Sequence, residues 1–195
     1  MMSLPETRTD PPAARSGFAL FPTAIGNCGI AWDTRAVITG VQLPEANESL
    51  TRTRLLRHHA GAREAAPPPA VHAVIEQIGL LLQGEAVDLT AVPLALDAVP
   101  DFNRRVYEIA RTIPPGQTLT YGEIATRMGE RSMARAVGQA LGANPFPIIV
   151  PCHRVVAAGG KNGGFSATGG VRTKLRLLAI EGANANALLP LFGDE

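Results

Sequence analysis

The sequence predicts an α/β protein of the α+β type with two unlike halves, and three observations support this prediction. Residues 17–45 alternate short β-type runs with turn residues, a pattern typical of a small antiparallel sheet. Helical apolar spacing replaces that alternation further along the chain, first in two long segments and then in several short ones. The second half is also basic, because residues 100–183 carry eleven Lys and Arg against five Asp and Glu, a net charge of +6, whereas the rest has −5.

Length and composition limit the class of protein. The 195 residues are 46% apolar and 18% charged, which is ordinary for a globular chain of one large or two small domains. No apolar run has the roughly eighteen residues of a membrane span, and the N-terminus has no signal-peptide pattern. We therefore expect a cytoplasmic protein without a membrane span.

The first domain is expected over residues 17–84, after a polar, Pro-rich lead at residues 1–16 that should be disordered. Turn residues at 25–27 and 33–35 divide the β-type runs of its sheet. Residues 85–100, "EAVDLTAVPLALDAVP", have no clear periodicity and are expected to form a linker.

Two helices are expected after the sheet. The segments "ESLTRTRLLRHHAG" and "PPAVHAVIEQIGLLLQGE" have helical apolar spacing, and the second opens with prolines and closes at Gly84. We interpret His58 and His59, in the first segment, as part of a solvated helix face.

The second domain is expected over residues 101–183, followed by a tail at 184–195. "DFNRRVYEIARTI" has one apolar helical stripe and ends at Pro-Pro-Gly. In "TLTYGEIATRMG", Thr120 and Glu123 have capping-box spacing, and in "ERSMARAVGQALGAN" Ser132 is the expected N-cap. Two short helices joined in a basic region outline a helix-turn-helix, and an ordinary helical hairpin has the same outline.

The second of these short helices is unusually thin. Arg135 stands near its start, among the small residues Ala134, Ala136, Gly138, Ala140 and Gly142. A thin helix can approach a narrow groove closely, so a nucleic-acid groove is one interpretation. Tight packing on a neighbouring element is the alternative, and the small residues can serve both faces.

The stretch "IIVPCHRVV" places a reactive side chain after an apolar run. Residues 148–150 are expected to be a buried strand, and a cysteine after a buried strand is either a small core residue or a nucleophile. His153 and Arg154 favour the nucleophile, because a nearby base or cation promotes the thiolate of Cys152. We expect a water between thiol and imidazole, and a third group that orients the imidazole.

Glu181 is the candidate for that third group. The segment "GGVRTKLRLLAIEGA" predicts a helix that stops at Gly182, with its charges reversed relative to the helix dipole. A randomly charged solvated helix explains this, and so does a carboxylate committed to His153 with basic residues that face phosphates, namely Arg172, Lys174 and Arg176. The Gly-rich segment before this helix can form a loop over a pocket, with Phe165 as a stacking surface.

Metal and disulfide chemistry are not indicated. Cys28 and Cys152 are the only cysteines, and in a chain without a secretion signal both are expected to be free thiols. The histidines lack the paired spacing of a zinc site. We expect no cofactor and no metal.

Together these residues resemble a known family. "NPFPIIVPCHRVV", preceded by "IPPGQTLTYGEIA" and "ARAVGQALGANP" and followed by "GGFSA" and "LLAIEG", is similar to the methylated-DNA–protein-cysteine methyltransferases, also called O6-alkylguanine-DNA alkyltransferases. The resemblance covers residues 102–183 in order and spacing. It implies a ribonuclease-H-like first domain and a mostly helical, winged helix-turn-helix-like second domain.

The resemblance also implies roles for the reacting residues. Cys152 would accept the alkyl group from O6 of guanine, assisted by His153 through water and by Glu181 behind it. Tyr121 would aid base flipping and protonate the leaving guanine at N3. Arg135 would be the arginine finger that fills the gap left in the duplex.

Further roles follow for the pocket. Asn144 would be the hinge between recognition helix and active-site segment, the carbonyls of Cys152 and Val155 would read the guanine edge, and the Ser166 region would meet the oxygen. Phe165 stands where the family often has tyrosine. The DNA-contacting residues implied are Thr120, Tyr121, Ala134, Arg135, Ala136, Gly138 and Arg172.

The function implied is direct DNA repair in a single turnover, by a monomer acting on double-stranded DNA with O6-alkylguanine. O4-alkylthymine is a second candidate substrate. A thioether on Cys152 cannot be cleaved by any group in the sequence, and the target atom lies within the base stack, so the base must be flipped out. Three alternatives are a non-catalytic lesion-binding protein, a cysteine hydrolase with the same three side chains, and a helix-turn-helix regulator.

Overall fold

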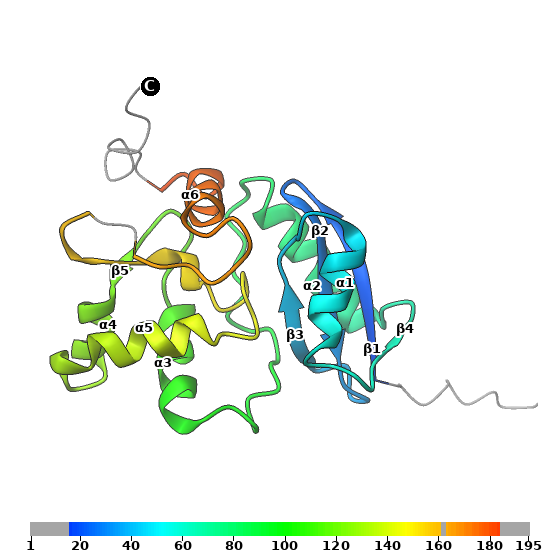
Figure 1. Cartoon of the computed structure of the whole chain (residues 1–195), viewed down its shortest axis with the longest axis horizontal. Helices are drawn as coiled ribbons and strands as arrows, with labels where there is room; N and C mark the ends of the chain where they lie inside the picture. Colours follow the sequence, from blue (N-terminus) through cyan, green and yellow to red (C-terminus); the bar gives the residue numbers. More distant parts are fainter. Residues whose placement is uncertain (1–15, 161–162, 184–195) are drawn as a thin grey trace, which may run out of the picture.

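The computed structural model describes residues 16–160 and 163–183, so the expected tail and all but one residue of the expected lead lie outside the described residues. The first half is built on a four-stranded sheet of order β3-β2-β1-β4 (Figure 1). The strands β1 (Gly17–Thr23), β2 (Gly26–Trp32) and β3 (Ile38–Gln42) form the expected antiparallel meander. β4 (Arg63–Glu64), which no periodicity indicated, pairs parallel with β1.

Two helices cover opposite faces of this sheet (Figure 1). On one face, α1 (Glu48–Leu56) packs Leu55 against Phe18 and Ala31. On the other face, α2 (Pro69–Leu81) places its buried stripe in the main core of the molecule. α2 begins at a proline, as its sequence predicted.

The expected helix face with His58 and His59 is wrong, because α1 ends at Leu56 and both histidines lie beyond it. His59 packs on β3, where its Nε2 atom leaves no room for a side-chain carbon on Gly40. The ring thus occupies the space that glycine leaves on the strand. Burial, together with the neighbouring His58, lowers the pKa of His59.

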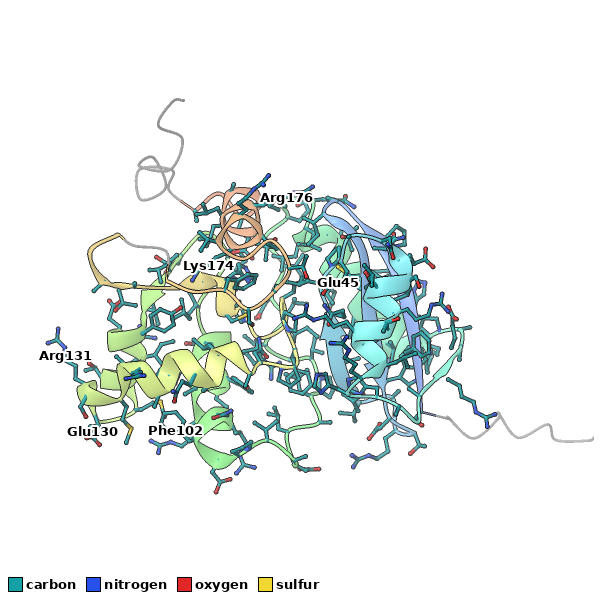
Figure 2. The ribbon with its side chains drawn as sticks, viewed as in Figure 1. Glu45, Phe102, Glu130, Arg131, Lys174 and Arg176 are labelled. Atoms are coloured by element: carbon teal, nitrogen blue, oxygen red, sulfur yellow. The ribbon has the colours of Figure 1, made fainter. Side chains whose placement is uncertain are left out.

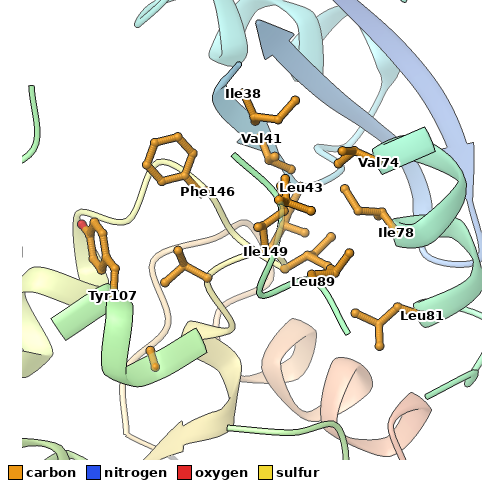
Figure 3. Packing of buried hydrophobic residues seen from close by; sticks show 14 of the residues in the cluster. Ile38, Val41, Leu43, Val74, Ile78, Leu81, Leu89, Tyr107, Phe146 and Ile149 are labelled. Carbon is orange, nitrogen blue, oxygen red and sulfur yellow. The ribbon is translucent and has the colours of Figure 1, made fainter. Parts of the chain in front are cut away.

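The two halves share one apolar core, drawn in Figure 3. The amide of Val41 donates to the carbonyl of Pro145 over 2.9 Å, so a strand of the first half bonds directly to the second. The segment 85–100 has no helix, yet Leu89 and Val92 are buried and the amide of Ile38 donates to the carbonyl of Pro93. The connecting segment is therefore packed into the molecule.

The second half is mainly helical. Its helices are α3 (Asp101–Arg111), α4 (Tyr121–Arg127), α5 (Ala134–Gly142) and α6 (Val171–Ile180), and β5 (Leu119–Thr120) pairs parallel with β6 (Val155–Val156). Short 3₁₀ turns connect them at Arg131–Met133, Cys152–Arg154 and Ala158–Gly160.

Of the two predicted N-caps, that of α4 is present in the structure and that of α5 is not. The capping box of α4 is confirmed, because the amide of Glu123 donates to Thr120 Oγ1 and the amide of Thr120 donates to the Glu123 carboxylate. The prediction that Ser132 caps α5 is wrong. The chain enters α5 through a 3₁₀ turn that already contains Ser132, and its hydroxyl donates to Glu130 over 2.6 Å.

α6 lies within the segment predicted to be helical, and Gly182, with φ of +69°, follows its C-cap residue Glu181. The interpretation that basic residues of α6 face phosphates is wrong for Lys174. The Lys174 side chain is fully buried and its Nζ donates to the carbonyl of Val155 over 2.6 Å. Arg176 donates to the carbonyl of Ala24 in the first half over 2.7 Å, and Figure 2 shows the two side chains on different sides of α6.

Candidate active site

The segment that leads to Cys152 is a buried turn and not the expected strand. Ile148 has φ of +76°, and the amide of Val150 donates back to the carbonyl of Phe146 over 2.8 Å. Prolines stand on both sides of residues 148–150 and have no N–H for a strand ladder. The apolar run was therefore correctly predicted to be buried, but between the two prolines it forms a turn and not a strand.

Asn144 holds this turn through both ends of its side-chain amide. Its Nδ2 donates to the carbonyl of Val150, and its Oδ1 accepts from the amide of Phe146, each over 2.9 Å. Asn144 follows the end of α5 by two residues. It thereby links that helix to the backbone just before Cys152.

Cys152 opens a 3₁₀ turn whose next two side chains converge on one carboxylate. His153 Nε2 lies 2.8 Å from Oε1 of Glu181, and the guanidinium of Arg154 donates to both Glu181 oxygens over 2.8 Å. The three side chains are only 1%, 6% and 3% exposed for His153, Arg154 and Glu181. A buried, charge-assisted network of this kind has little freedom to move.

The network assigns a protonation state to the imidazole. Burial alone would raise the pKa of Glu181, but hydrogen bonds from His153 and Arg154 lower it to about 2. An ionised carboxylate only accepts, so Nε2 carries the proton and Nδ1 keeps a lone pair. Burial lowers the pKa of His153 despite Glu181, and its Nδ1 has no hydrogen-bond partner among the described residues. His153 is thus a neutral base at neutral pH.

The thiol of Cys152 needs such a base. Burial raises its pKa, and the Asn144 side chain and Lys174 offset that effect only in part. Arg154, which was expected to promote the thiolate, is instead committed to Glu181. The nearby cation is Lys174, whose pKa burial lowers to about 8 against the opposing effect of Cys152.

Cys152 lines two cavities. The outer cavity, about 570 Å³, is bounded by Tyr121 and by the exposed face of α5 with Arg135. The inner cavity, about 350 Å³, lies between the halves and is lined by β3, the end of α1 and Asn144. Phe165 and Ser166 line both cavities, so they form the wall beside the thiol.

Tyr121 stands at the outer cavity against the Gly-rich loop. Burial, and then Cys152, raise the pKa of its phenol, which is therefore a donor at neutral pH. Its hydroxyl lies 3.4 Å from the carbonyl of Gly164. A side-chain carbon on Gly163, whose φ is +66°, would lie 2.8 Å from the ring, so this close approach requires glycine.

The small residues of α5 do serve two faces. Gly138 faces Tyr121, because a side-chain carbon added to Gly138 would lie 3.7 Å from the Tyr121 ring. On the other face, the carbonyl of Ala140 accepts a hydrogen bond from the buried hydroxyl of Tyr107 over 2.9 Å. Arg135 is exposed and Ala134 and Ala136 are partly exposed. Of the other predicted residues, Thr120 is the cap of α4, Arg172 is exposed at the start of α6, and Val155 is buried with its carbonyl bonded to Lys174.

Sequence reasoning missed two members of this site, Arg154 as a partner of Glu181 and Lys174 as a buried amine. A signal existed for Lys174. It precedes Leu177 and Leu178 by three and four residues, so it lies on the buried stripe of α6. Arg154 had no such signal, because its place beside Cys152 indicated a cation that promotes the thiolate and nothing local indicated Glu181 as its partner.

Within residues 16–160 and 163–183 no group of three or more His, Cys, Asp or Glu side chains could hold a metal ion. Over the same residues, no helix has the length and apolar character to cross a membrane. Cys28 is buried, and burial raises its pKa to about 12.

Comparison with known proteins gives a consistent set of relatives. Residues 101–183 match the model of the 6-O-methylguanine DNA methyltransferase DNA-binding domain. A methylated-DNA–protein-cysteine methyltransferase of Mycolicibacterium paratuberculosis is 45% identical over 126 residues, which are 64% of this chain and 73% of that protein.

Two crystal structures from Mycobacterium tuberculosis have a similar fold. The O6-methylguanine methyltransferase is 35% identical with a TM-score of 0.68, covering 91% of this chain and 99% of that one. The second structure, of OGT in complex with DNA, is 33% identical with a TM-score of 0.68, covering 87% and 96%. The mixed α/β architecture described above is shared with these structures.

Proposed function

The chain belongs to the family of methylated-DNA–protein-cysteine methyltransferases, and on this premise we propose that it repairs DNA by moving the alkyl group of O6-alkylguanine to its own Cys152. One observation carries the assignment to these residues. Cys152 lines an open cavity, and the next residue, His153, forms a buried pair with Glu181. A neutral imidazole with a free acceptor nitrogen is what a protonated thiol needs in order to react.

The reaction forms one bond and breaks one. The sulfur of Cys152 attacks the alkyl carbon, the new carbon–sulfur bond forms, and the carbon–O6 bond breaks. The thiol proton passes to Nδ1 of His153 through a water, and Glu181 stabilises the imidazolium at Nε2. The phenol of Tyr121 supplies a proton to N3 of the leaving guanine, and its raised pKa keeps that proton available.

The outer cavity is the proposed entrance for the flipped base. The DNA-contacting residues are Thr120, Tyr121, Ala134, Arg135, Ala136, Gly138 and Arg172. Flipping costs a few kcal/mol of unstacking, and Arg135 projects from the thin helix α5 to fill the gap in the duplex. Cys152 and Ser166 line this cavity, and Ser166 lies near the oxygen of the bound base. The carbonyls of Cys152 and of the buried Val155 read the guanine edge. Asn144 is the hinge behind them and Phe165 the stacking face.

The finer description of the fold belongs to the same proposal. We assign residues 17–84 to a ribonuclease-H-like domain, residues 85–100 to the connection, and residues 101–183 to a winged helix-turn-helix-like domain formed around α4 and α5. The partner is double-stranded DNA with O6-alkylguanine, bound by a monomer.

The decisive test is the intact mass of the protein after mixing with duplex DNA that contains O6-methylguanine. We expect each protein to gain one methyl group on Cys152 and then to stop. The Cys152 thiolate is a poor leaving group, so the methyl group stays on the sulfur. Cys152→Ser should bind the DNA without gaining mass, whereas Cys28→Ala should react like wild type, since Cys28 is buried and far from ionisation. Repeated turnover without added thiol would refute the single-use mechanism.

A further inference from the structure

The loop of residues 163–170, which we call the wall loop, is held from two directions. It carries Phe165 and Ser166, the residues between the two cavities beside Cys152. From the second half, Tyr121 packs on Gly163, and the hydroxyl of Thr173 donates to a wall-loop carbonyl over 2.6 Å. The amides of Arg172 and Lys174 also donate to the carbonyls of Gly169 and Gly170. Further contacts come from the first half of the chain.

Glu45 and Arg54 make those contacts, and Figure 2 shows Glu45 at the junction of the halves. The hydroxyl of Thr168 donates to the carboxylate of Glu45. The guanidinium of Arg54 lies 3.0 Å from that carboxylate, 3.4 Å from the Ser166 carbonyl and 3.4 Å from the Thr168 hydroxyl. The three residues Glu45, Arg54 and Thr168 therefore form a small network, which we call the latch.

The two first-half residues of the latch differ in how much of their side chains is exposed. The Glu45 side chain is 10% exposed and the Arg54 side chain 43% exposed. The carboxylate is held further by Gln42, whose Nε2 donates to Oε1 over 3.1 Å. Glu45 is thus an anchor on the first half, and Arg54 spans from it to the Ser166 backbone.

Residues 163–166 of the wall loop have no regular secondary structure, although Phe165 and Ala167 pack against the core. Gly163, Gly169 and Gly170 all have positive φ, which glycine adopts without strain. Because glycine has more accessible backbone conformations than other residues, this segment has more freedom to lose. A glycine-rich segment loses more entropy on ordering, and contacts at its middle reduce that loss when the base binds. The latch touches the loop at its middle, at Ser166 and Thr168.

We propose that Glu45 and Arg54 are positioning residues for alkyl transfer: from the first half, they hold the wall loop so that Phe165 and Ser166 stand at the right distance from Cys152. This inference rests on the proposed function. It gives the first half of the chain a role in the chemistry although none of its residues reacts.

The test compares variants in single-turnover transfer from O6-methylguanine duplex DNA. Arg54→Ala and Thr168→Val should each lower the transfer rate at saturating DNA by roughly three- to tenfold, the effect expected for losing partly exposed charge-assisted hydrogen bonds. Thr168→Ser keeps the hydroxyl and should restore the wild-type rate. DNA affinity should be unchanged, and alkylation of Cys152 by iodoacetamide should not be slower.

The matched control is Arg52→Ala. Arg52 is on the same helix with 36% of its side chain exposed, but it pairs with Glu48 and Glu64, both in the first half. Its removal should leave the transfer rate at the wild-type value. Arg54→Ala should also speed amide hydrogen exchange in the wall loop without DNA, whereas Arg52→Ala should not.

The outcomes are separable. If wild type transfers no methyl group, the proposed function fails, and the exchange measurement still tests the latch. If wild type transfers and Arg54→Ala is equally fast, the latch has no role in positioning. An equal loss in Arg52→Ala, or a Thr168→Ser protein as slow as Thr168→Val, would likewise overturn the proposal.

Discussion

At the scale of single residues, the reactivity of Cys152 depends on a proton that burial keeps on the sulfur. The raised pKa of this thiol means that a neighbouring imidazole must accept the proton, and Glu181 keeps that imidazole in the tautomer that can do so. Arg154 fixes the carboxylate in place from the other side. The chemistry of the site is therefore shared among four buried or half-buried side chains.

Glu181→Gln should slow alkyl transfer by about tenfold or more at neutral pH. A glutamine can donate its amide N–H to Nε2 of His153, which would move the imidazole proton to Nδ1 and remove the acceptor. As pH rises toward the pKa of the thiol, Cys152 ionises without help, so the defect should narrow. Single-turnover rates between about pH 6 and pH 10 measure this.

The control for this variant is binding. Affinity for lesion DNA should stay close to wild type, because Glu181 is only 3% exposed and lies behind His153. Circular dichroism checks that the variant is folded. A folded Glu181→Gln protein with an unchanged rate at neutral pH would limit the residue to a structural ion pair with Arg154.

At the scale of elements, sequence patterns predicted the positions of the helices well and their ends less well. The capping box of α4 depends on two residues three apart, so it could be predicted locally. The start of α5 could not, because Ser132 enters a 3₁₀ turn and bonds to Glu130. Residues 148–150 gave an apolar signal that strands and buried turns share, so the signal alone could not predict the positive φ of Ile148 or the bonds from Asn144.

Arg135→Ala should separate base extrusion from chemistry. Arg135 is exposed on α5 at the outer cavity, and the hydrogen bonds that join His153, Arg154 and Glu181 do not involve it. Removing a side chain that fills the gap in the duplex raises the cost of flipping, and unstacking is paid only when the base starts inside DNA. We expect most of the rate on duplex DNA to be lost, and the rate with free O6-benzylguanine to stay near wild type.

Arg172→Ala is the comparison for that experiment. Arg172 is exposed at the first turn of α6, and a phosphate contact there should affect all DNA equally. Its removal should weaken binding and make the salt dependence shallower by about one unit of slope, without a selective flipping defect. If Arg135→Ala instead loses both activities equally, Arg135 supports the fold or the pocket.

At the scale of the whole molecule, the features that sequence reasoning missed are contacts between distant segments. The parallel strand β4 has two residues, too few for any periodicity. The shared core joins β3, residues 85–100 and Phe146, and the latch joins residues more than one hundred positions apart. Periodicity describes one element at a time, so it has no information on which elements meet.

The same long-range contacts should make stability fall in acid. The folded pKa of Glu181, about 2, is below its ordinary value of 4.5, so the unfolded chain binds more protons between these values. The stability contributed by the ionised carboxylate is fully present above about pH 4.5 and is lost as pH falls toward 2, by about 3 kcal/mol in total. Glu181 joins the end of α6 to the turn at Cys152, and Arg154 extends the network to the carbonyl of Ile113 after α3, so the loss should appear in global unfolding.

Urea unfolding at pH 7, 4.5 and 3 measures this loss of stability. Glu181→Gln should be less stable at pH 7 but should lose less between pH 4.5 and 3 than wild type does, and an equal loss in both proteins would assign the acid sensitivity to other carboxylates.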